Sequence, residues 1–272
     1  MLQKINNIDP NIQKKLSVQI ALTGLSFLVS NPDTKEPMFY TEKKFSSPHT
    51  PEELLLELQR SFSEYKELEH PTEVILLYAT NVYAPVPLSL FDETKASEYL
   101  KFNSKILAND YISHDTLESA GTVVVYIPYV NINNYIFDRF GSFQYYHATT
   151  VLLRSFLASE KHSRDAKVFV HVTETHFDLL VLKEGTLQLC NSYLYKTPED
   201  FVYYILFCFE QLNLNPETVP VTFVGSISEE SDLYHIVYRY IRNVTVATAN
   251  SAKGQATLDE RPQNNYLLTL SL

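Results

Sequence analysis

Residues 16–29 read LSVQIALTGLSFLV and predict the strand–turn–strand unit from which each half of the chain is built. The first seven letters alternate between apolar and small or polar side chains, which is the pattern of a half-buried strand. Thr23-Gly24 is a turn signal that we expect to need a positive φ, and residues 25–29 predict a second strand running back beside the first. A strand, an amphipathic helix and a buried strand are then predicted over residues 38–45, 52–65 and 73–79.

The same order recurs in the second half of the chain. Residues 167–182 read KVFVHVTETHFDLLVL and predict strands that start 151 positions after residues 16 and 25. Thr197 and Pro198 form a helix-start signal, because threonine caps a helix and proline suits its first turn. The second half therefore predicts two more strands around one helix, over residues 186–195, 197–212 and 219–224.

Further helices and strands extend each half. In the first half they are predicted over residues 94–102, 122–127, 131–140 and 143–146, and in the second over residues 229–241 and 244–247. A helix over 149–159 links the halves, and the charged run 161–165 marks the boundary. We therefore expect one half in residues 1–160 and the other in residues 161–272. Residues 250–265 predict a polar loop, and the apolar residues 266–272 are expected to dock on one half.

Composition excludes several classes of protein. The 272 residues carry a net charge of −10, which argues against nucleic-acid binding and against binding to anionic membranes. We find no signal-peptide pattern and no apolar run of the ~20 residues that a membrane helix needs. Cys190 and Cys208 are interpreted as buried thiols in a reducing compartment. We expect a cytoplasmic protein with no membrane insertion and no nucleic-acid partner.

Glycine is scarce in this chain. It has six glycines, whereas average usage of ~7% would give about three times as many. No two of them fall within one loop, so the sequence contains neither GxGxxG nor GxxxxGK[ST]. The two commonest phosphate-binding loops are therefore excluded.

The repeated order of elements resembles the actin-like ATPase fold, a duplicated ribonuclease-H-like domain. Five short motifs carry a closer likeness: LSVQI (16–20), LSF (25–27), VPLSLFD (86–92), YLKFN (99–103) and His147 followed by VLL (151–153). In these motifs the chain resembles a bacterial family of unknown function with this fold. The resemblance implies an α/β protein whose halves each contain a mixed five-stranded sheet flanked by helices.

The resemblance also implies where a site would lie. In actin-like proteins one hairpin turn from each half grips the nucleotide phosphates, typically with an Asp-x-Gly pattern. Here the first turn has Gly24 but no acid, the second has Glu174 but no glycine, and the adenosine-side loop has only Gly225. The candidate cleft residues are Thr23, Gly24, Ser26, Thr173, Glu174, Gly225 and Ser226. We expect a degenerate nucleotide site without cofactor, the alternative being ATP with magnesium.

Three histidines are candidates for functional residues. His147, before the linking helix, is interpreted as a local cap or hinge residue, the alternative being a histidine in the cleft between the halves. His171, Glu174 and His176 are the weak metal candidates, because a hairpin turn at Glu174 would bring the two histidines together. The simpler interpretation is a pair of partly buried histidines bonded to the backbone.

These observations leave three hypotheses for the function. The first is a non-catalytic binding or scaffold protein with a protein partner, for which loop aromatics such as Tyr83, Tyr129 and Tyr135 would offer a surface. The second is an ATP-binding or ATP-hydrolysing protein with a non-standard cleft. The third is a metal-assisted hydrolase that uses the His171/Glu174/His176 hairpin.

Overall fold

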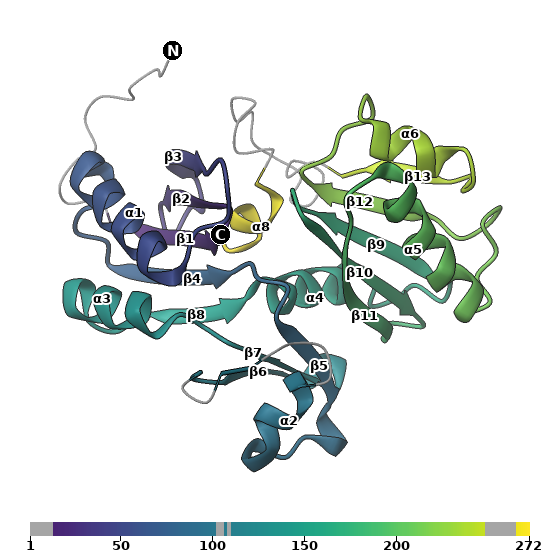
Figure 1. The fold of residues 1–272 in the computed structure, drawn as a ribbon, viewed down its shortest axis with the longest axis horizontal. Coiled ribbons are helices and arrows are strands. Elements are labelled where there is room, and N and C mark those ends of the chain that lie inside the picture. The colour runs from purple at the N-terminus through teal and green to yellow at the C-terminus, as the bar shows by residue number, and fades with distance from the viewer. Residues whose placement is uncertain (1–12, 102–105, 108–109, 248–264) are drawn as a thin grey trace.

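The computed structural model describes residues 13–101, 106–107, 110–247 and 265–272. Two five-stranded mixed sheets stand on either side of a linking helix, as Figure 1 shows. This confirms the duplicated fold expected from the sequence. The polar loop predicted over 250–265 and the end of the helix predicted over 94–102 fall largely outside the described residues, as does the end of the YLKFN motif.

The first sheet has the strand order β3-β2-β1-β4-β8. Its strands are β1 (Lys15–Ala21), β2 (Gly24–Ser30), β3 (Pro37–Lys44), β4 (Glu73–Tyr78) and β8 (Gln144–His147). The first three are antiparallel, whereas β4 and β8 run parallel to β1. Helices α1 (Pro51–Glu64) and α3 (Val130–Phe140) pack against each other beside this sheet. Phe62 on α1 joins the layers, because its ring contacts Phe27 of β2 and Phe140 of α3.

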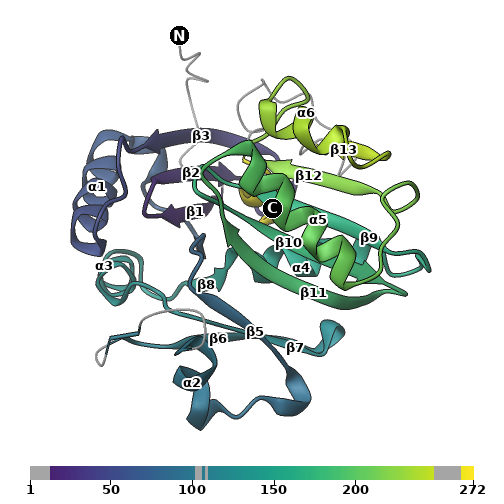
Figure 2. The ribbon, with the colours of Figure 1, turned by 45° about the vertical axis from the view of Figure 1, so that its right-hand side comes forward.

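The second sheet repeats this topology as β11-β10-β9-β12-β13. Its strands are β9 (Lys167–Val172), β10 (His176–Lys183), β11 (Thr186–Leu194), β12 (Val221–Gly225) and β13 (Val244–Val246). Helices α5 (Pro198–Gln211) and α6 (Asp232–Tyr238) cover one face of this sheet (Figure 2). Both α1 and α5 begin with proline after a threonine capping box, so the two halves start their main helix with the same chemistry.

A third sheet, which the sequence did not predict, is inserted in the first half. It has the order β5-β7-β6 and lies beneath the two large sheets in Figure 1. Its strands are β5 (Tyr83–Pro87), β6 (Ser113–Leu117) and β7 (Thr122–Tyr126), and helix α2 (Ala96–Lys101) packs on it. The strand expected over 122–127 is its central strand. Tyr83, expected in an exposed loop, is instead buried within β5.

Two helices pack between the halves. Helix α4 (Ala148–Ser159) lies between the sheets, and its Phe156 stacks on Phe169 of β9 with ring centroids 4.1 Å apart. Helix α8 (Tyr266–Leu270) packs against α4, β1, β2 and β12, so the apolar end of the chain docks on both halves rather than one. One continuous core therefore runs from the first sheet through α4 and α8 to the second.

Candidate functional site

A cleft of about 280 Å³ opens between the two halves. All seven residues proposed from the sequence line it: Thr23, Gly24, Ser26, Thr173, Glu174, Gly225 and Ser226. They come together because β1–β2 and β9–β10 are equivalent hairpins of facing sheets, and β12 ends beside β9. Residues that the sequence did not single out also line it, among them Gln19, Lys43, Lys44 and the start of the α8 segment.

The first hairpin is closed by close packing rather than by a left-handed turn. We expected a positive φ at Thr23-Gly24, and this was wrong, because neither residue is among the positive-φ residues of the structure. A Cβ on Gly24 would lie 2.8 Å from the carbonyl oxygen of Lys43 on β3. The glycine is therefore required because a neighbouring strand approaches its Cα. The carbonyl groups of Leu22 and Thr23 accept bonds from the amides of His49 and Phe45.

The second hairpin has no glycine and is held by threonine and histidine side chains. The Thr173 amide donates to the His176 carbonyl at 2.9 Å, and the His176 amide donates to Thr173 Oγ1 at 3.2 Å. The imidazole Nδ1 of His176 lies 3.0 Å from Thr173 Oγ1 and 3.3 Å from Thr175 Oγ1. Burial lowers the pKa of His176. The side chains of Thr173, Thr175 and His176 thus bond within the turn.

The loop after β12 turns sharply against the central strand β9. Gly225 has φ +91°, and a Cβ there would lie 2.4 Å from the Val172 carbonyl oxygen. The Ser226 amide donates to that same oxygen at 2.8 Å, and the Ile227 amide donates to the Gly225 carbonyl at 2.9 Å. Only glycine fits this position, because a side chain would meet both backbone strain and backbone atoms.

The metal candidates do not form a ligand set. The register places His171 opposite Asp178, and His176 lies two residues nearer the turn, on the same face of the sheet. Glu174 is 45% exposed, and its carboxylate lies 3.2 Å from Lys44 Nζ across the cleft mouth. Among the described residues, no group of three or more His, Cys, Asp or Glu side chains is arranged to hold a metal ion.

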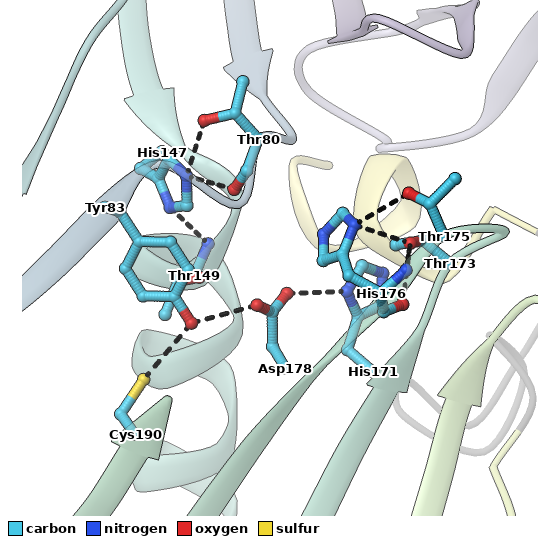
Figure 3. Close-up of polar contacts among 10 residues, drawn as sticks. All are labelled: Thr80, Tyr83, His147, Thr149, His171, Thr173, Thr175, His176, Asp178 and Cys190. Carbon is cyan, nitrogen blue, oxygen red and sulfur yellow. Dashed lines mark hydrogen bonds and ion pairs between the residues drawn. The ribbon is translucent and has the colours of Figure 1, made fainter. Parts of the chain in front are cut away.

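A buried carboxylate lies behind the cleft. Asp178 on β10 is 2% exposed; it accepts a bond from the Tyr83 hydroxyl at 2.9 Å and lies 3.3 Å from Nδ1 of His171 (Figure 3). Burial raises the pKa of Asp178, but the His171 hydrogen bond and the neighbouring histidines outweigh it and hold this pKa below its usual value. Burial raises the pKa of the nearby Cys190 thiol, so it stays protonated.

The Tyr83–Asp178 bond joins the inserted sheet to the second half. Tyr83 comes from β5, and Asp178 comes from β10 of the facing sheet. The hydroxyl also lies 3.9 Å from the Cys190 sulfur on β11. No local sequence pattern predicts this pair, since the two residues are 95 positions apart.

His147 is the N-cap of α4 and does not line the cleft. Its Nδ1 accepts a bond from the Thr149 amide at 3.2 Å, and its Nε2 lies 3.0 Å from the Thr80 carbonyl (Figure 3). Both bonds suit a neutral ring with the proton on Nε2, and burial lowers the pKa of His147 to about 4. Its contacts are those of a capping residue that ties α4 to the end of β4.

Comparisons with known proteins agree with this geometry. The family model described as "Protein of unknown function (DUF3822)" matches residues 3–244. A crystal structure from Bacteroides thetaiotaomicron, described as a protein with actin-like ATPase fold and unknown function, is similar with a TM-score of 0.81. It is 21% identical over 96% of this chain and 95% of that one. No curated protein matches the chain.

More distant solved structures share the fold. The PilM-PilN type IV pilus biogenesis complex is similar with a TM-score of 0.59 and 11% identity, covering 96% of this chain and 98% of that chain. The ethanolamine utilization protein EutJ from Carboxydothermus hydrogenoformans has a TM-score of 0.50 and 9% identity, covering 89% and 86%. Within the described residues, no helix is long and apolar enough to cross a membrane.

Proposed function

The chain belongs to the DUF3822 family, whose description assigns no function, and we propose that it is a non-catalytic binding or scaffold protein. In this proposal the cleft between the halves engages a protein partner. One observation carries it: three backbone amides and both carboxylates at the cleft are already paired with other groups of the chain, so these groups are not free to bind a nucleotide.

The backbone amides of the second half illustrate this most clearly. A phosphate cradle needs amide N–H groups that point at the anion. Here the amides of Thr173, Ser226 and Ile227 donate to carbonyl oxygens of the chain itself. A triphosphate that used these amides would have to break these bonds, and the second hairpin and the loop after β12 would have to rearrange.

The carboxylates at the cleft do not suit magnesium either. Mg²⁺ in nucleotide sites is held by one or two carboxylates together with phosphate oxygens. Within the described residues, Glu42 and Glu174 are the acids that line the cleft, and both pair with Lys44, at 3.6 and 3.2 Å. The ammonium group between them opposes a cation. The residues present therefore do not fit Mg-ATP.

The fold itself is compatible with a role in assembly. PilM, whose structure is that of a complex with PilN, is an actin-like neighbour of this chain. The cleft volume of about 280 Å³ lies just below the range of small-molecule sites. A partner that inserts a few side chains fits this space better than a whole nucleotide does.

Thermal unfolding with and without ATP tests the proposal. A ligand present at ten times its Kd stabilises the native state by about 1.4 kcal/mol, which for a chain of this size raises the Tm by roughly 3–5 °C. We expect no shift with 2 mM Mg-ATP (roughly ten times the Kd of a weak, 0.2 mM site). A shift of several degrees would favour the alternative, an ATP-binding protein, for which the convergence of the seven predicted residues on one cleft is the supporting observation.

Photo-crosslinking tests the partner directly. A photoreactive residue at Thr23, in the cleft, should capture a protein in cells, and the same residue at the exposed Glu52 of α1 should not. Equal labelling from both positions, or none from Thr23, would contradict a protein-binding cleft.

A further inference from the structure

The helix α8 lies in the floor of the proposed binding cleft. Asn265, Tyr266 and Leu267 line the cleft, and the helix packs on β1 and β2 of the first sheet and on β12 of the second. Figure 1 shows it between the two sheets, close to the β1–β2 hairpin. The chain thus places one of its own segments where the two halves meet.

The contacts of α8 are those of a docked ligand. Tyr266, Leu267 and Leu268 are almost fully buried, with 5%, 1% and 1% of their surface exposed. Tyr266 stacks on Phe156 of α4 with ring centroids 6.1 Å apart. A consecutive aromatic–leucine–leucine set therefore fills an apolar seat that both halves supply.

Two side-chain bonds anchor the far end of the segment on β1. Ser271 Oγ donates to Ser17 Oγ at 2.8 Å, and Lys15 Nζ donates to the Ser271 carbonyl oxygen. Neither bond belongs to a sheet ladder. The segment can therefore leave its seat while the strand pairing of β1 with β2 and β4 stays intact.

The helical form of the segment depends on the seat. A helix of five residues is too short to be stable in water by itself, because nucleation is unfavourable and few backbone bonds repay it. Asn265 caps its N-terminus, because the side-chain oxygen Oδ1 accepts from the Leu268 amide at 3.0 Å. Undocking and unfolding of α8 are therefore one event.

From these contacts we infer that residues 265–272 are a removable plug, an internal ligand that competes with a partner's segment for the same seat. The inference rests on the proposed function, because it names the partner's chemistry: a short helical segment with an aromatic residue followed by two leucines. Docked, the plug fills the floor of the cleft and joins the two halves. Undocked, it leaves an apolar groove between β1, β2, β12 and α4.

Hydrogen exchange on the intact protein tests whether the plug opens. The amides of Leu268 and Thr269, bonded to Asn265, should exchange about a hundredfold faster than those of Val170 in β9 and Ile20 in β1. Their exchange should also be insensitive to low urea, because local opening exposes little surface. Exchange of α8 together with β9, at the same rate and urea dependence, would make it a fixed part of the core and overturn the inference.

A binding experiment then tests the seat. In the full-length Leu267→Asp variant the plug carries a buried charge, so a labelled peptide of residues 265–272, NYLLTLSL, should bind the variant and not the wild-type protein. Leu56→Asp on the exposed surface of α1 is the matched control, which should not bind. A folded Leu267→Asp variant that ignores the peptide refutes the seat. If this variant does not fold, hydrogen exchange on the wild-type protein decides.

The two tests separate this inference from the proposed function. Fast exchange of α8 without any crosslink from Thr23 would contradict the proposed partner and support the plug. A crosslink from Thr23 together with an α8 that opens only on global unfolding would support the binding cleft and contradict the plug.

Discussion

The two hairpins that face each other across the cleft occupy equivalent positions in the two sheets and differ in chemistry. The first relies on Gly24, which lets the edge strand β3 approach its Cα. The second has no glycine and is closed by Thr173 and His176, and the glycine of this half, Gly225, lies one strand away against β9. The two halves therefore turn at equivalent positions, but different residues stabilise the turn in each half.

The largest expected effect comes from filling the two glycine positions. Gly225→Ala should destabilise the protein by more than about 3 kcal/mol, because the alanine would combine a positive φ with a clash against the central strand. Gly24→Ala should cost about 1–2 kcal/mol, since its clash is with an edge strand that can move. Urea unfolding followed by circular dichroism measures both.

Gly121→Ala is the control for this pair. Gly121 has φ +58° with no atom within 4 Å of the added Cβ, so it reports backbone strain alone, about 1 kcal/mol. Equal losses at positions 24 and 225 would show that the two halves tolerate change alike, against the comparison drawn here.

The next effect is a pH dependence that both halves share. His147 is neutral in the native state because burial lowers its pKa from 6.5 to about 4, while in the unfolded chain it titrates near 6.5. Between these values the unfolded state binds a proton that the native state does not, so stability falls as the pH drops from 6.5 to 4. The loss from this residue should reach roughly 3 kcal/mol.

Variants assign this pH dependence to the two halves. His147→Gln in the first half and His176→Gln in the second should each flatten the curve of unfolding free energy against pH. The exposed His162→Gln should leave it unchanged. An unaltered slope in His147→Gln would contradict the neutral capping histidine.

The smallest expected effect is the loss of a single tyrosine hydrogen bond to a buried aspartate. Such a bond can be removed between the two halves or within the first half. Tyr83→Phe should cost about 2 kcal/mol, because it removes one of two bonds to the buried Asp178 carboxylate. Tyr126→Phe should cost about 1 kcal/mol, since Asp115 keeps the bonds from Thr150 and from the His147 amide. Thermal and urea unfolding of both variants give the ranking, and the reverse order would indicate that Asp178 is better satisfied than its contacts imply.

The main elements could be predicted because their signals are local. The alternation of residues 16–29 and 167–182 and the cap at Thr197 depend on neighbours in the chain, and the structure confirms these strands and helix. The strands β5 and β6 were missed for physical reasons. Tyr83–Pro87 contains two prolines, which argue against a strand, and Ser113–Leu117 is polar because Asp115 faces inward to bond with Tyr126. The helix predicted over 229–241 is shorter, since Ser231 caps it and it ends at Tyr238.

The candidate site also has features that the sequence predicts and features that it does not. The cleft residues could be placed because equivalent turns of a duplicated fold meet at one location. The docking of α8 on both halves and the Tyr83–Asp178 bond join residues far apart in the sequence, and no local pattern encodes such pairings. The positive φ expected at Gly24 failed because the constraint there is a contact with Lys43, made by a third strand.

The two cysteines of the folded protein are expected to be unreactive toward thiol reagents. Cys190 and Cys208 are free and buried, and burial raises the pKa of each thiol. A maleimide added to the native chain therefore meets no reactive sulfur at neutral pH, because the thiolate is the nucleophile. A single cysteine introduced at an exposed position can therefore be labelled without labelling of Cys190 or Cys208. The rate at which the two natural thiols are labelled then measures how often the structure around them opens.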